Sequence, residues 1–226
     1  MTTITAESIA QTRDIPVTSV ERRVKRNHPR RDEILEQAET LIREHRLQNV
    51  TLRGLARSMS LSATALYEYF SDKQELLAAL YERAANRLLA SLVDSDDPTL
   101  DIDQRVRIIG RDYFRFGVEE SGLYLFLFDR PWEDFGPWVQ STAGTPEEEL
   151  QDHRPAFAFI VALLESEKTK FRDDFRGVNA AVELWALVYG FVALSLNHQL
   201  PSGTDAEALV ERAVDHLLAG WRRPWN

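Results

Sequence analysis

Residues 51–77, TLRGLARSMSLSATALYEYFSDKQELL, contain two short apolar periodicities separated by a brief polar break. The spacing predicts one helix over 52–59 and a second over 63–70. Thr51 and Ser62 precede these segments and carry the hydroxyl groups that favour helix N-caps. Two short helices joined by a tight turn and braced by flanking helices form a helix–turn–helix. This stretch therefore decides the architecture of the amino-terminal part of the chain.

Helical periodicity continues on both sides of this pair, and no stretch alternates like a strand. The carboxyl-terminal half contains Pro131 and Pro137 as breakers, so we expect short kinked helices over 121–140 and a loop over 141–149. The fold class is therefore predicted to be all-α. The longer helices are expected at 30–47, 73–93, 102–116, 146–170 (with a bend at Pro155), 178–199 and 204–222.

The charge of the chain is unevenly distributed. The 226 residues carry a net charge of −9, which by itself argues against a nucleic-acid partner. Residues 21–90, however, hold 13 Lys and Arg against 10 Asp and Glu, so this part is net +3 and the remainder is net −12. The basic residues gather before Asp32, which predicts a basic arm next to the helix–turn–helix.

The second helix of the pair has a predicted exposed face. If Leu66 and Phe70 are buried, Thr64 and Glu68 point away from the core at 100° per residue. Small, hydroxylated and aromatic side chains there can approach base edges in the major groove. Phosphate contacts are expected from the periphery and from an arm that lies along phosphates or enters the minor groove. The predicted DNA-binding residues are Thr51, Arg53, Ser62, Ala63, Thr64, Ala65, Tyr67, Glu68, Tyr69, Lys73, Arg26 and Arg30.

Two questions about this face stay open at the level of sequence. Short helix pairs and a Leu-Tyr-Glu-Tyr-Phe stretch also occur in ordinary helical cores. Glu68 is repelled by phosphate, although it can accept a hydrogen bond from a cytosine amine or be neutralised by Arg57.

Residues 51–77 resemble the DNA-binding segment of the tetracycline-repressor (TetR) family of bacterial regulators. The matching positions are Thr51, Arg53, Ala56, Leu61, Ser62, Leu66, Tyr67, Tyr69, Phe70, Lys73 and Leu76. With the preceding helix, the resemblance covers residues 30–77. Three positions depart from the family pattern: Ser60 and Thr64 replace usual glycines, and Ala63 replaces a polar residue. Ser60 is therefore expected to adopt a strained left-handed conformation.

The resemblance implies three parts of the chain: a disordered basic arm over 1–27, a helix–turn–helix domain over 28–75, and a ligand-sensing and dimerisation domain over 76–226. The polar, Pro-containing stretch 95–101 is expected to be the main break between the two halves. RDYFRFGVEESGLYLFLF and ELWALVYGFVAL further resemble a TetR subgroup with a Trp-His-Gly motif, with Tyr189 in place of the usual His.

The segment 178–199 is apolar on nearly all sides, so it must be covered on both faces. One cover is predicted to be a second subunit, with the last helix completing an intermolecular four-helix bundle. A central helix in a monomer is the alternative. The predicted interface residues are Val182, Phe191, Leu194, Val214, Leu217 and Trp221.

Aromatic residues in the carboxyl-terminal half are candidates for an apolar effector pocket, or for ordinary core. They are Phe126, Phe128, Trp132, Phe135, Trp138, Trp185 and Tyr189. The excess of acidic residues in this half favours a cationic or neutral hydrophobic effector over an anionic one.

The sequence contains no pattern typical of an enzyme or a metal site. Cysteine is absent, the five histidines lie far apart, and no phosphate-binding or nucleophile motif occurs. We therefore expect no cofactor, no metal and no catalysis, and a cytoplasmic bacterial protein that joins the nucleoid when bound to DNA. The predicted function is a ligand-responsive homodimeric repressor acting on a palindromic operator. The alternatives are a helical carrier or enzyme without DNA binding, and an activator that responds to a protein partner.

Overall fold

The computed structural model describes residues 29–45, 52–128 and 154–222. Every regular element within these ranges is helical, which confirms the all-α prediction. The elements are α2 (Pro29–His45), α3 (Leu52–Ser58), α4 (Ala63–Tyr67), α5 (Lys73–Ser95), α6 (Ile102–Glu119), α7 (Ser121–Phe128), α10 (Pro155–Ser166), the 3₁₀ turn η4 (Lys168–Lys170), α11 (Gly177–Leu196) and α12 (Ala206–Arg222).

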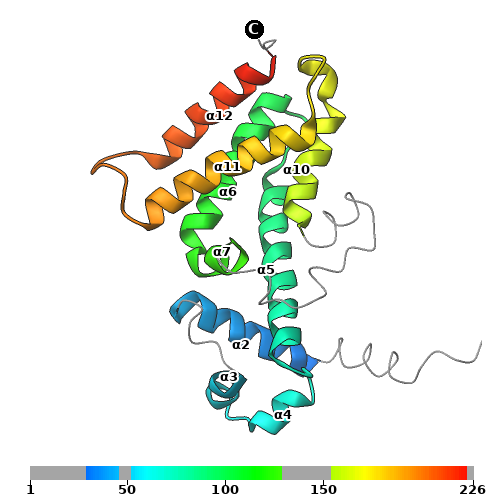
Figure 1. Cartoon of the computed structure of the whole chain (residues 1–226), viewed down its shortest axis with the longest axis vertical. Helices are drawn as coiled ribbons and strands as arrows, with labels where there is room; N and C mark the ends of the chain where they lie inside the picture. The colour runs from blue at the N-terminus through cyan, green and yellow to red at the C-terminus, as the bar shows by residue number, and fades with distance from the viewer. Residues whose placement is uncertain (1–28, 46–51, 129–153, 223–226) are drawn as a thin grey trace, which may run out of the picture.

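The long helix α5 connects the two ends of the molecule (Figure 1). Its first turns pack on α2 and follow directly after α4, and its later turns enter a bundle formed with α6, α10, α11 and α12. Helix α7 lies between this bundle and α2, and packs on both. The polar stretch 95–101 therefore separates α5 from α6 inside the bundle, and is not the break between the two ends that the sequence predicted.

Helices α3 and α4 form the predicted helix–turn–helix. Ser60 in the turn has φ of 54°, so the expected left-handed conformation is confirmed. Ser62 caps α4 by accepting a hydrogen bond from the amide of Ala65 at 3.1 Å, as predicted. Helix α4 ends at Tyr67, three residues earlier than predicted, because the carbonyl of Leu66 accepts the amides of both Tyr69 and Phe70.

The boundaries of α5 and α6 follow local capping chemistry. Asp72 caps α5 through the amide of Glu75, and Asp101 forms a capping box with Gln104 at the start of α6. Both cap residues have an extended backbone conformation, so each helix begins directly after its cap.

The predicted helix over 146–170 is wrong in its later part. Helix α10 begins at Pro155, ends at Ser166, and is followed by the separate turn η4. Pro155 is a first-turn residue and not a bend, because proline lacks the amide that an interior position would need. Residues 146–153 lie outside the described part of the chain.

Helix α11 packs on α6, α10 and α12, and is the most apolar long helix of the bundle. By length and composition alone α11 could also cross a membrane; 33% of its apolar window is buried in the structure. Its packing against three other helices instead makes it the central helix of the bundle, with one uncovered side.

Candidate functional site

The outer face of α4 has the exposure that its periodicity predicts. Leu66 and Phe70 are fully buried, whereas Thr64 and Glu68 are exposed. Ser62 is also exposed, and Ala65 is half-buried beside them. The tip of the molecule therefore presents short polar side chains on a helix whose other face is anchored in the core.

The remaining predicted DNA contacts divide into three groups. Lys73 is exposed at the first position of α5, next to α4. Tyr69 is half-buried against the core, and Arg30 pairs with Glu33 on the same turn of α2. The structure does not describe the side chains of the other five predicted residues, which are Thr51, Arg53, Ala63, Tyr67 and Arg26.

Arg31 holds the helix–turn–helix in position, a role that was not predicted. It is only 5% exposed, and its guanidinium lies 4.0 Å from the centre of the Phe70 ring. It also donates to the carbonyl of Tyr69 and pairs with Glu75 at 3.1 Å. The available signal was its position three residues before the buried Ile34, on the same face of α2.

A buried carboxylate joins α2 to α5. Glu39 is 4% exposed and accepts hydrogen bonds from Arg43 at 3.1 Å, Arg83 at 2.8 Å and Arg87 at 2.9 Å. Arg43 and Arg87 also reach Glu120 at the end of α6, at 2.9 and 3.4 Å. These five charged residues, called here the Glu39 network, connect the helix–turn–helix to the bundle.

The start of α7 lies against the backbone of α2. A Cβ atom at Gly122 would lie 2.6 Å from the carbonyl oxygen of Ile42 and 2.8 Å from the Cα of Arg43. Only glycine permits this approach without moving one of the helices. The Glu39 network and Gly122 together place α7 and α5 in direct contact with α2.

An apolar cavity of about 50 Å³ lies between five helices of the bundle and is partly open to solvent. Helix α5 contributes Tyr81, Ala85 and Leu88 to its wall, one turn from the arginines that bind Glu39. The other lining residues are Ile109, Gly110, Tyr113, Leu127, Phe128, Arg154, Pro155, Ala156, Phe157, Ile160, Leu184, Trp185 and Val188.

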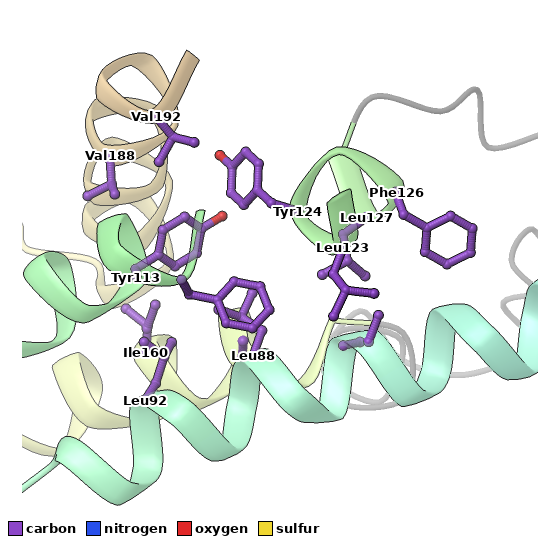
Figure 2. Close-up of a cluster of buried hydrophobic side chains, with 14 of the residues drawn as sticks. Leu88, Leu92, Tyr113, Leu123, Tyr124, Phe126, Leu127, Ile160, Val188 and Val192 are labelled. Carbon is purple, nitrogen blue, oxygen red and sulfur yellow. The ribbon is translucent and has the colours of Figure 1, made fainter. Parts of the chain in front are cut away.

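The predicted effector residues fall in different places. Phe128 and Trp185 line the pocket, with ring centres 5.7 Å apart. Phe126 is fully buried but does not line it, and Figure 2 shows its ring pointing away from Tyr113 and Tyr124. Tyr189 is 38% exposed and contacts the Tyr124 ring at 6.1 Å. The remaining three, Trp132, Phe135 and Trp138, lie outside the described residues.

Three polar atoms are buried around the inner wall of the pocket. The hydroxyls of Tyr113 and Tyr124 and the indole nitrogen of Trp185 interact with one another, and among the described residues they have no hydrogen-bond partner outside this group. Figure 2 shows the two hydroxyls directed toward the same space beside Val188 and Val192. Burial raises the pKa of Tyr113 well above its usual value, and the neighbouring Tyr124 raises it further.

The wall of the pocket carries little charge. Arg154 is the one charged side chain among its described lining residues, and its guanidinium lies 5.7 Å from the Trp185 ring centre. Burial also raises the pKa of Tyr81 to about 12, although the charge of Arg154 lowers it. The acidic composition of this half therefore does not extend to the described pocket wall, which removes the reason for expecting a cationic effector.

The predicted interface residues also separate into two groups. Val182 and Leu194 of α11 are exposed, at 49% and 38%, while Phe191 and Leu217 are half-buried. Val214 and Trp221 of α12 are instead buried in the core of the chain itself. Val214 packs close to Gly110 of α6, and Trp221 packs between aromatic rings and donates to Glu183 at 2.6 Å. Neither of these two residues is available to a partner.

Comparison with known proteins identifies both parts of the chain. The sequence model of the tetR family of bacterial regulatory proteins matches residues 34–80, and that of a tetracyclin repressor-like C-terminal domain matches residues 106–217. No curated protein matches the chain significantly.

Several solved structures have the same fold. A protein of unknown function from Rhodococcus sp. RHA1 is 20% identical with a TM-score of 0.69, and the match covers 87% of this chain and 97% of that one. A TetR family transcription regulator from Marinobacter aquaeolei VT8 is 21% identical (TM-score 0.61; 84% and 93% covered). The fatty acid degradation regulator FadR from Bacillus halodurans is 17% identical (TM-score 0.65; 88% and 99% covered).

At these identities the structures establish the fold, and the two sequence models, which together span more than two thirds of the chain, establish the family. The chain is a member of the TetR family of bacterial transcriptional regulators.

Proposed function

We propose that this regulator is a homodimeric repressor that binds a two-fold symmetric operator and is released from it by a hydrophobic effector. The exposed face of α4, with Thr64 and Glu68 outward and Leu66 and Phe70 buried, is the observation that carries the proposal. A helix of this exposure pattern in a TetR family chain is suited to enter the major groove.

DNA contacts are assigned by chemistry. Thr64 and its neighbours on α4 read base edges, where a hydroxyl can donate or accept and a methyl group can contact thymine. Lys73 at the start of α5 binds phosphate, as does Arg53, and the basic arm before α2 adds further phosphate contacts. The domain boundaries proposed for these roles remain 28–75 for DNA binding and 76–226 for sensing.

The dimer is proposed to form through the uncovered side of α11. Val178, Val182 and Leu194 are exposed there, and Phe191 and Leu217 lie at the edge of the core. Pairing of this side with its symmetry mate removes apolar surface from water and places two α4 helices on one face of the assembly. Two such helices read half-sites about 34 Å apart, one turn of DNA.

The effector is proposed to bind in the pocket bounded by Tyr81, Tyr113, Phe128 and Trp185. Binding changes DNA affinity only if the effector prefers the arrangement of helices that does not fit the operator. Helix α5 contributes some residues to the pocket wall and others to the Glu39 network. A shift of α5 on effector binding is therefore carried to α2.

The DNA-binding part is tested by selecting duplexes from a random pool and measuring fluorescence anisotropy at several salt concentrations. A two-fold symmetric sequence is expected to be enriched. Lys73→Ala is expected to weaken binding to all duplexes and to reduce the salt slope by about 1. Lys168→Ala, an exposed lysine on η4 far along the chain, is the matched control and should change neither.

Substitution Thr64→Val should instead change which sequences are enriched, because it alters a group assigned to base edges. Absence of any preferred sequence would contradict the proposal and favour a helical carrier or enzyme without DNA binding. Sequence-selective binding without response to hydrophobic compounds would favour an activator or repressor that responds to a protein partner.

A further inference from the structure

A group of buried hydrogen-bond donors lies at the inner wall of the pocket, whose other described lining residues are apolar apart from Tyr81 and Arg154. Tyr113 is 5% exposed and Tyr124 is 2% exposed, and the Trp185 nitrogen is fully covered. Tyr113 and Trp185 line the pocket, and the Tyr124 hydroxyl lies beside that of Tyr113 (Figure 2). We call these three groups the donor cluster.

The donor cluster cannot satisfy itself. It holds three hydrogens to donate, but only the two phenol oxygens can accept, because an indole nitrogen is a donor only. If Trp185 donates to Tyr113 and Tyr113 to Tyr124, the hydrogen of Tyr124 still lacks an acceptor within the cluster. A buried donor without an acceptor is costly, so a molecule in the pocket that carries an acceptor gains affinity from the cluster.

The surroundings of the donor cluster select against a negatively charged acceptor. Burial raises the pKa values of both Tyr113 and Tyr124, which means that a negative charge at this position is penalised by loss of water. A carboxylate placed there meets the same penalty. Arg154 is the one described lining residue whose positive charge can offset this penalty. Its guanidinium, however, lies toward Tyr81 and the face of Trp185.

Resting on the proposed effector function of this pocket, we infer that the effector is a neutral, largely apolar molecule whose carbonyl oxygen accepts hydrogen bonds from the donor cluster of Tyr113, Tyr124 and Trp185. The hydrocarbon body fills the space between Leu88, Ile109 and Phe157, and the carbonyl oxygen provides the acceptor that the described residues do not supply there. Selectivity then arises because an analogue without this oxygen leaves the donors unpaired.

Three probes of nearly equal shape test the inference in equilibrium dialysis against the full chain. Benzophenone carries the neutral carbonyl, diphenylmethane lacks an acceptor, and diphenylacetate carries a carboxylate. Benzophenone is expected to bind about tenfold more tightly than diphenylmethane, the scale of one buried hydrogen bond. It should also bind more tightly than diphenylacetate.

Variants assign the difference to the donor cluster. In Tyr113→Phe and Tyr124→Phe the preference for benzophenone over diphenylmethane should fall at least threefold, whereas diphenylmethane should bind as before. Trp185→Phe provides an independent check should either tyrosine variant be unstable. Ser195→Ala is the matched control, because it removes a buried unpaired hydroxyl from α11 outside the pocket.

Equal binding of benzophenone and diphenylmethane would overturn the assigned effector class and leave the proposed effector pocket standing. Tighter binding of diphenylacetate would do the same and point to Arg154 as the selecting group. If none of the three probes binds up to its solubility limit while the chain still binds its selected duplex, the effector function of the pocket fails, and the inference with it. DNA binding itself is not affected by any of these outcomes.

Discussion

The carboxylate of Glu39 on α2 accepts a hydrogen bond from Nε of Arg83 on α5 at 2.8 Å, and so ties the helix–turn–helix to the bundle. Arg83 lies two residues after Tyr81, which lines the pocket. The same helix therefore carries a pocket residue and an anchor of the DNA-binding end within one turn.

Glu39→Gln removes the charge that holds three arginines together. We expect a loss of about 1–3 kcal/mol in the free energy of unfolding, because three arginine hydrogen bonds lose their charged, buried acceptor. Urea unfolding measures the change. Glu36→Gln, an exposed position on the same helix, is the control and should stay within about 0.5 kcal/mol of the parent. Equal effects of the two substitutions would contradict a stabilising role for the Glu39 network.

Gly122→Ala places a methyl group against the backbone of Ile42, which cannot yield as a flexible side chain can. We expect destabilisation of about 1–3 kcal/mol because α7 and α2 must separate. Gly220→Ala, at an exposed helical position with no atom near the added Cβ, should be neutral or stabilising by up to about 1 kcal/mol. Thermal unfolding of both variants distinguishes a close helix contact from general intolerance of alanine.

Ser60→Gly should stabilise the helix–turn–helix. Ser60 has φ of 54°, where a side chain is strained and glycine is not. The gain is expected to be up to about 1 kcal/mol, partly offset by the greater freedom of glycine in the unfolded chain. Ser58→Gly, two residues earlier and inside α3, should destabilise instead. If both substitutions destabilise, the left-handed turn is not a source of strain.

Val182→Glu tests the proposed dimer. Val182 is 49% exposed on α11, and a carboxylate buried there against a second subunit would lack a partner. Sedimentation equilibrium should show the dimer dissociation constant raised more than tenfold. Val93→Glu on α5, at a valine of 46% exposure, is the matched control and should leave association unchanged. A parent chain that is monomeric at all concentrations would refute the dimer outright.

The buried tyrosines predict a loss of stability at alkaline pH. Burial raises the folded-state pKa of Tyr113 well above its usual value and that of Tyr81 to about 12, whereas unfolded tyrosine titrates near 10. The unfolded state therefore releases protons first, and the stability present below about pH 10 falls as the pH rises toward 12. Urea midpoints between pH 8 and 11.5 should fall less steeply in Tyr113→Phe than in the parent; parallel curves would be inconsistent with this origin.

Local chemistry was sufficient to predict most of the helices and the exposed face of α4 from the sequence. The burial of Leu66 and Phe70, the exposure of Thr64 and Glu68, and the caps at Ser62 and Asp72 depend only on residues within one or two turns. The left-handed conformation of Ser60 was predicted from the resemblance, because Ser60 stands where the TetR pattern has a glycine, and its φ of 54° confirms it.

The tertiary structure alone decided how those helices meet. Glu39 binds arginines more than forty residues away, and Gly122 must be glycine because of the backbone of α2. Phe126, Val214 and Trp221 are apolar residues whose sequence pattern suited a pocket or an interface, yet they are core. The pattern of apolar residues determines which side of a helix is apolar. The way the helices pack determines what covers that side, and therefore which aromatic side chains line the pocket.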